Sequence, residues 1–420
     1  MTVNPCNKLQ DPEKQDAPEV YPPDEGIMPW IQVAGSFCLM FASWGSVMSY
    51  GAFQEFYKSN MITGQTSSST IAWIGSLQAF LLMFGAALTG TLYDSGYFRE
   101  MLYAGSFLMV FGLMMTSLAH EYWQFILAQS VCAGSGMGLV ALGALATTGT
   151  WFVKRRGLAV GIGSTGASVG GIVLPISLRH LIPQIGFPWA VRSMAFIVAA
   201  MLILPLAVSR QRLRPNRRNT LLDFRSLLQI DFGLYWLSIF LAFLGFFVFF
   251  TFIESWAVAT HLDTHGVPPY YILAIINASS IFGRIFPNFL SDTIGPLNIQ
   301  APATLIAGVL VFAWIPAHSI GSVMVVSILY GFFSGSLVSL PPSSIASMTA
   351  NMGELGGRIG MVFLAMAFGS LIGAPVAGAI VQQLGYDGAR IYGGCMIIAG
   401  AAVMFASRIK KTGPKFLVKG

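Results

Sequence analysis

The sequence predicts an all-α membrane protein, with twelve transmembrane helices arranged as two pseudo-symmetric six-helix bundles. Three observations predict this fold: a composition poor in charge, twelve apolar runs of membrane-spanning length, and a residue spacing that recurs in both halves. Of the 420 residues, 55% are hydrophobic and only 10% are charged, whereas soluble domains carry about 25% charged residues. Together with a mean hydropathy of +0.69, this composition excludes an ordinary soluble protein.

The apolar runs follow a polar, Pro-rich opening segment, with six runs before a basic stretch and six after it. Each run is long enough, at about 1.5 Å per residue, to cross a hydrocarbon core of about 30 Å. Helices are expected because only they satisfy the backbone within a single span. The runs cover residues 30–53, 69–92, 101–119, 122–150, 158–181, 189–208, 232–259, 270–290, 301–317, 320–346, 359–381 and 389–405.

These runs divide the chain into five parts. We expect a disordered cytoplasmic tail (1–26), a first six-helix bundle (27–208), a cytoplasmic linker (209–231), a second bundle (232–406) and a basic cytoplasmic tail (407–420). The opening segment lacks the basic and apolar pattern of a cleaved signal peptide. The four cysteines form neither a disulfide framework nor a zinc pattern, and we expect no metal and no cofactor.

The positions of the 23 Lys and Arg residues predict the orientation, because these residues accumulate in cytoplasmic loops. With both termini cytoplasmic, Arg284 lies inside a span and four basic residues face outward, namely Lys58, Arg179, Arg192 and Arg390. We therefore expect a multi-pass protein of the plasma membrane, with residues near Arg214 cytoplasmic and those near His265 and His318 external. We attribute the net charge of +6 to the excess of Lys and Arg on the cytoplasmic side and not to a nucleic-acid partner.

The two halves share a spacing as well as their hydropathy. Gly85 precedes Asp94 by nine residues at the end of the second run, and Gly283 precedes Asp292 by nine at the end of the eighth. Parallel repeats of this kind are typical of secondary transporters.

Two segments carry a resemblance to a known family. The loop from Gly90 to Arg99 resembles the loop motif of the major facilitator superfamily, and residues 277–298 resemble its monocarboxylate transporter family, especially the fungal branch. Further agreement lies in residues 151–161, 330–335, 339–342 and 357–361. The resemblance implies a secondary transporter that moves a small organic solute, an organic anion or a secondary metabolite, by alternating access.

Two departures from the family pattern bear on coupling. Gln54 stands where proton-coupled members have a lysine, and Ser280 stands where they have an aspartate. Proton symport needs a group that changes protonation during alternating access. We therefore expect no tight proton–monocarboxylate symport, and instead facilitated diffusion or exchange.

Arg284 is the first candidate for contact with the solute. It lies eight residues from Asp292, about 12 Å into the membrane, where an arginine costs about 3 kcal/mol. Its planar guanidinium suits a carboxylate, although a structural pairing with another span is the alternative. Asn277 and Ser280 share its helical stripe and join it as candidates.

A second polar stripe follows the first run, and Tyr50 and Gln54 are its best candidates for solute contact. Its serines are as well explained by close helix packing in lipid.

Gating is assigned to Asp94, Arg99, Asp292 and Arg358, since both aspartates end their runs beside basic residues at the inner side. Glu55 and Glu254 fall near the outer ends of their runs, and each is expected to be a solvated or a rim residue.

Two other functional classes are alternatives to a transporter. A membrane-embedded enzyme would need metal ligands or paired intramembrane carboxylates, and the sequence has no such pattern. A non-transporting nutrient sensor on the same fold stays open. The expected partners are a small organic solute and the lipid bilayer, and no protein partner is indicated.

Overall fold

A computed structural model of the chain describes residues 26–57, 68–152, 155–211, 224–263, 266, 268–349 and 355–413. All regular structure within these ranges is helical. The first half contains α1 (Ile27–Met48), α2 (Tyr50–Phe56), α3 (Ser68–Asp94), α4 (Phe98–Thr116), α5 (Tyr122–Phe125), a π-helix (Ile126–Ala133), α6 (Gly134–Trp151) and α7 (Arg156–Val208). A 3-10 helix (Phe224–Leu228) precedes the second half, which contains α8 (Ile230–Ala259), α9 (Tyr271–Ile294), α10 (Pro296–Ala313), α11 (Ile320–Ser339), α12 (Pro341–Met348) and α13 (Leu355–Thr412).

Ten stretches of the described chain are long and apolar enough to cross a membrane, and two of them are long enough to cross it twice. α7 has 53 residues and α13 has 58, and each is broken at one glycine. Gly186 has a φ of 76° and Gly385 a φ of 75°, values that glycine adopts without the steric cost of a side chain. The chain reverses at these glycines, so the prediction of twelve spans in two bundles is confirmed.

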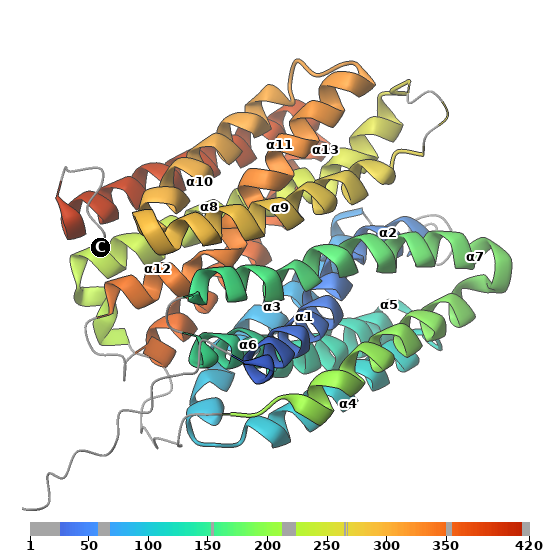
Figure 1. The fold of residues 1–420 in the computed structure, drawn as a ribbon. Coiled ribbons are helices and arrows are strands. Elements are labelled where there is room, and N and C mark those ends of the chain that lie inside the picture. Colours follow the sequence, from blue (N-terminus) through green and yellow to red (C-terminus); the bar gives the residue numbers. More distant parts are fainter. Residues whose placement is uncertain are drawn as a thin grey trace, which may run out of the picture.

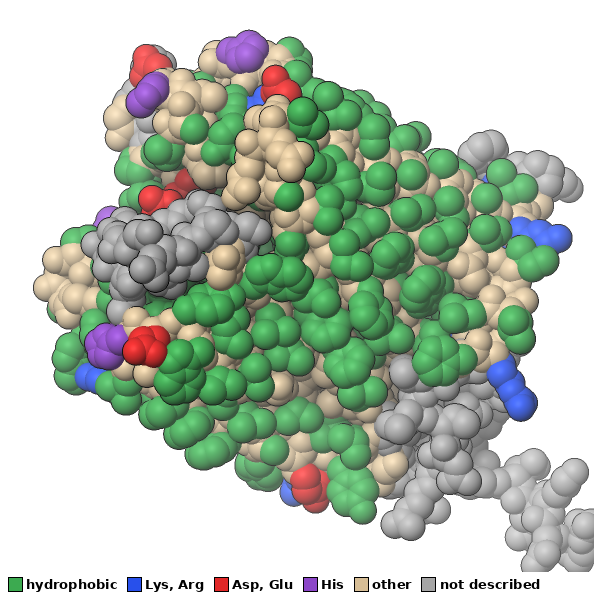
Figure 2. Space-filling model, turned by 180° about the vertical axis from the view of Figure 1, so that it is seen from behind, with side chains coloured by type: hydrophobic (Ala, Val, Ile, Leu, Met, Phe, Trp, Pro, Cys, Tyr) green, Lys and Arg blue, Asp and Glu red, His purple; other side chains and the backbone are tan. Residues whose placement is uncertain are grey.

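The two bundles lie side by side, with α1 to α7 in one and α8 to α13 in the other (Figure 1). The halves meet chiefly along α7 with α9 and along α3 with α13. We call the end where Val208 leaves α7 and Ile230 begins α8 the linker end, and the opposite end, where α7 reverses at Gly186, the far end. Figure 2 shows a belt of hydrophobic side chains between one end with protruding Lys and Arg and another with His.

The repeated glycines occupy equivalent helix crossings in the two halves. A side chain at Gly85 would lie 3.1 Å from Gly138 of α6, and one at Gly283 would meet the backbone of Phe332 of α11. Each glycine therefore lets one helix of its bundle approach another closely, which explains why the spacing recurs.

The contact between α7 and α9, which we call the seam, closes the linker end. The Gly157 amide donates to Asp292 Oδ1 at 3.1 Å, the Arg284 Nη1 donates to the Ser164 carbonyl at 3.3 Å, and the Asn277 amide donates to the Gly171 carbonyl at 3.3 Å. Small residues on α7 thus allow the polar face of α9 to reach its backbone.

The opposite face of α9 is exposed and aromatic. Phe282, Phe286 and Phe289 are each more than half exposed, whereas Asn277, Ser280 and Arg284 are buried. Aromatic side chains on this face suit contact with lipid, and the polar residues are directed to the other half.

We expect Gly161→Ala to open the linker end, because a side chain at Gly161 would lie 2.7 Å from the carbonyl oxygen of Arg284. The crowding acts only between the halves, and overpacking of this kind costs about 1–3 kcal/mol. Thiol labelling of Ser168→Cys, a fully buried position of α7, should rise about tenfold from the linker side. Gly321→Ala has open space around the added carbon and should leave labelling unchanged. Equal labelling in the two variants would refute the seam as the linker-end closure.

Candidate functional site

A cavity of about 660 Å³, including the part open to solvent, lies between the two halves. Side chains of α1, α2 and α3 form one wall, and those of α8, α9 and α13 form the other. These segments place the cavity in the far half of the molecule, since they include the last turns of α1 and the first turns of α3 and α9. The lining residues are Val47, Met48, Tyr50, Gly51, Gln54, Ala72, Gly75, Ser76, Ala79, Phe247, Phe250, Thr251, Leu273, Ser370 and Ala374.

The cavity wall is mainly apolar and aromatic, and it contains no charged residue among the described ones that line it. The Tyr50 hydroxyl donates to the Ile71 carbonyl, so Tyr50 offers its ring more than its hydroxyl. Phe247 and Phe250 add two rings from the second half. Gln54 and Thr251 bring polar groups from opposite walls. Such a wall binds aromatic or aliphatic groups and leaves a few positions for hydrogen bonds.

Both predicted contact residues of the first half, Tyr50 and Gln54, therefore line the cavity. Arg284 does not line it, although the sequence placed it with them as a solute contact. The side chain of Arg284 is 6% exposed and lies in the seam, eleven residues beyond Leu273, or about 16 Å along α9. Its Nε donates to Ser280 Oγ at 3.3 Å.

Asn277 and Ser280 also lie in the seam. Asn277 donates to the carbonyls of Leu273 and Gly171, one helical turn from the cavity wall at Leu273. Ser280 accepts from Arg284. The three polar residues of α9 thus connect the cavity to the closed linker end.

The four residues assigned to gating all lie at the linker end, but they make different contacts. Asp292 reaches across the halves to Gly157. Asp94 ends α3, and Arg99 is exposed in the first turn of α4. Arg358 donates to the Met348 carbonyl at 3.0 Å and to Gln229 Oε1, at the start of α8, at 2.7 Å. Their gating role stays a prediction, for which Asp292 has the most direct geometry.

Sequence analysis missed an ion pair at the far end. Arg179 of α7 pairs with Glu254 of α8, so the contact joins the two halves. The side chains are 18% and 17% exposed, respectively, so Glu254 lies near the end of its run as expected but is partly buried in an ion pair. The sequence does place opposite charges near the same ends of two apolar runs, which could have indicated the ion pair. Hydropathy does not show which runs are neighbours, however.

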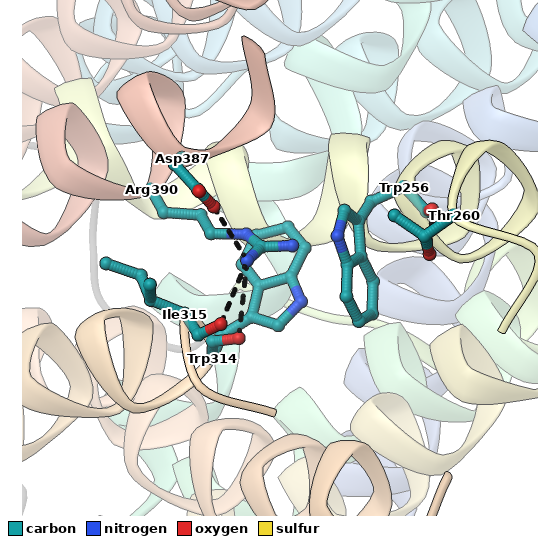
Figure 3. Close-up of polar contacts among 6 residues, drawn as sticks. All are labelled: Trp256, Thr260, Trp314, Ile315, Asp387 and Arg390. Carbon is teal, nitrogen blue, oxygen red and sulfur yellow. Dashed lines mark hydrogen bonds and ion pairs between the residues drawn. The ribbon is translucent and has the colours of Figure 1, made fainter. Parts of the chain in front are cut away.

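A second buried arginine, Arg390, lies near the turn of α13 at Gly385 and is 1% exposed. Its guanidinium lies 4.5 Å from the Trp256 ring and 4.3 Å from the Trp314 ring. It donates to Asp387 Oδ1 at 3.0 Å and approaches the Trp314 and Ile315 carbonyls at 3.5 and 3.4 Å (Figure 3). These contacts fasten α8, the end of α10 and α13 together within the second half.

Comparison with known proteins agrees with this architecture. Residues 33–351 match the family model of the Major Facilitator Superfamily. The MFS-type transporter dbaD of Emericella nidulans is 38% identical over 91% of this chain and 86% of its own length. The fujikurins efflux protein of Gibberella fujikuroi is 35% identical over 97% of this chain and 89% of its own length.

The human organic anion transporter MFSD10 has a similar structure, with a TM-score of 0.68 over 90% of this chain and 98% of that one. At 15% sequence identity the likeness concerns the fold alone. None of these relatives gives support to the sensor alternative. The family match and the identities show that the chain belongs to the Major Facilitator Superfamily, as a multi-pass membrane transporter.

Proposed function

We propose that this protein exports a small, largely apolar organic solute of the secondary-metabolite type by alternating access. The observation that carries the proposal is the cavity between the halves, which is walled by both bundles and closed toward the linker end by the seam. A solute bound there leaves on one side or the other according to which end of the two halves separates.

The chemistry of the wall favours an uncharged group on the solute. A carboxylate in the cavity would lose hydration and meet no opposite charge among the described lining residues. Arg284 is buried in the seam, and an anionic group reaches it only when α7 and α9 separate. Arg284 therefore either binds a solute that approaches from the linker side or stabilises the closed seam.

The direction and the subfamily are parts of the same proposal. A relative that is named an efflux protein and covers nearly the whole chain supports export. The motif of residues 277–298 supports a place in the fungal branch of the monocarboxylate transporter family. The uncharged cavity, with Gln54 in its wall, supports a solute other than a small monocarboxylate.

We also propose that the protein lies in the plasma membrane with both termini and the linker in the cytoplasm. Arg408 and Lys410 lie at the linker end, and His120, His180 and His318 lie at the far end, which agrees with the positive-inside rule. Tails of 1–26 and 407–420 then flank the bundles of 27–208 and 232–406, joined by the linker of 209–231. Most of the first tail, residues 414–420 of the second tail, Arg214 and His265 lie outside the described residues.

Phe250→Ala should slow transport, because it removes a ring from the cavity wall, and an aromatic contact contributes about 1 kcal/mol, or roughly fivefold. Purified protein in liposomes can be supplied with pairs of solutes, each pair being a hydroxylated aromatic amide and the acid that matches it. The release of each solute is measured by mass spectrometry. Phe286→Ala is the control, since that ring is 58% exposed on the outer face of α9. Transport of the acids alone, or equal loss in both variants, would contradict the proposed site.

Arg284→Ala should abolish transport while the protein still inserts, because the Ser164 carbonyl loses its donor and the seam loses a contact between the halves. Arg284→Lys should rescue poorly, since lysine keeps the charge but not the planar fork. Ser280→Ala removes only the 3.3 Å contact to Nε and should have a small effect. Near-normal rates in Arg284→Lys would show that the fork is not needed.

The orientation predicts opposite labelling at the two ends. In a cysteine-free background, His318→Cys should react with an impermeant thiol reagent added to intact cells, and Lys410→Cys should react only after permeabilisation. Both side chains are exposed, so neither result depends on a conformational change. The reverse pattern would invert the proposed topology.

A further inference from the structure

The Tyr50 ring lies flat against the backbone of α3 at Gly75. A side-chain carbon added at Gly75 would collide with three successive carbons of that ring, Cγ, Cδ1 and Cε1, at nearly equal separations. An approach to the edge of the ring would bring one carbon much closer than its neighbours, so the ring presents its face to Gly75. Only glycine leaves room for this arrangement.

The Tyr50 hydroxyl fixes the ring in this plane. It donates to the Ile71 carbonyl, one helical turn before Gly75 on α3. The side chain is thus held at two points, and a solute that binds the ring does not have to immobilise it. Tyr50 is half-buried and lines the cavity, so the face that is turned away from Gly75 is the one available to a solute.

The neighbouring wall of α3 has only small side chains. Besides Gly75, the cavity is lined on this helix by Ala72, Ser76 and Ala79, which share one helical face by their spacing of three and four. No side chain of this stripe is long enough to cover the Tyr50 ring. The wall is therefore flat, and it leaves the free face of the ring open to the cavity.

Two further rings line the cavity from the second half. Phe247 and Phe250 of α8 both pack on Phe246, with ring centres 5.0 and 5.3 Å apart, respectively. Phe250 also packs on Tyr330 at 5.9 Å. Their own bundle therefore fixes their positions, and the cavity has an aromatic wall in each half.

We propose that Gly75 is a positioning residue that makes the Tyr50 ring a stacking platform, and that the cavity therefore selects solutes with a planar conjugated ring. Such a ring stacks on Tyr50 without displacing it, whereas a puckered saturated ring of the same carbon skeleton cannot lie flat on it. Aromatic pairs contribute more than the burial of their apolar area. Selection of this kind rests on the proposed function, because it acts on a solute bound in the cavity.

Protection of a reporter cysteine measures binding without transport. Thr251→Cys, on the cavity wall of α8, is placed in a cysteine-free background and labelled with a maleimide in detergent solution. Two uncharged probes, naphthalene carboxamide and its fully saturated decalin analogue, are compared by the concentration that halves the labelling rate. The decalin compound is the more apolar of the two, so an apolar cavity without a platform would favour it.

The naphthalene compound should protect at a concentration about fivefold lower, since an aromatic pair contributes about that factor. In Gly75→Ala this preference should vanish, because the added carbon forces the Tyr50 ring away from α3 and into the cavity. Alanine favours a helix more than glycine does, so this variant should fold. Gly90→Ala is the matched control on α3, since its added carbon would lie 3.5 Å from Leu142 and 3.6 Å from the Gly356 carbonyl. The preference should remain in this control.

A double substitution shows whether Gly75 acts through Tyr50. Tyr50→Ala should remove the preference by itself. Adding Gly75→Ala to it should change nothing further, because the ring that the new carbon would displace is gone. Tyr50→Phe should keep the preference, since it keeps the ring and loses only the bond to the Ile71 carbonyl.

The possible failures are distinguishable. Equal protection by the two probes would overturn the planar preference and leave the proposed function standing, whereas protection by neither would refute the cavity as a site for apolar solutes and so overturn both. A preference that survives Gly75→Ala would mean that Gly75 does not position the ring. A further loss when Gly75→Ala is added to Tyr50→Ala would mean that Gly75 does not act through the ring.

Discussion

The close approach of α7 to α9 is the constraint on which the rest of the structure depends. In lipid, apolar surface gains little by moving from acyl chains to another helix, so helices associate through tight packing and polar contacts. Gly157 and Gly171 give α9 access to the backbone of α7, and Arg284 uses this access to reach the Ser164 carbonyl. The cavity exists in the far half because the halves are joined this tightly in the linker half.

The two ends of the molecule are closed by different chemistry. At the linker end the contacts use backbone groups, as in the bond from the Gly157 amide to Asp292, and small residues that tolerate no added carbon. At the far end the contacts between the halves include the ion pair of Arg179 with Glu254 and the contact of Arg179 with the Tyr270 ring. The first set of contacts therefore depends on shape and the second on charge.

The sequence was sufficient for the fold but not for the relations between helices. Apolar runs and the paired spacing around Gly85 and Gly283 predicted twelve spans in two bundles, because lipid permits few alternatives. Helical periodicity also put Asn277, Ser280 and Arg284 on one buried face of α9. Periodicity does not say which helix covers a face, however. The separation of Arg284 from Tyr50 and Gln54, and the pairing of Arg179 with Glu254, therefore emerged only from the three-dimensional structure.

The tryptophan-lined clamp around Arg390 has a mechanical consequence for the far end. Trp256 lies two residues from Glu254 on α8, and Arg390 holds its ring against α13 and the end of α10. A movement of α8 that separates Glu254 from Arg179 would therefore either carry the end of α10 and α13 with it or break these contacts.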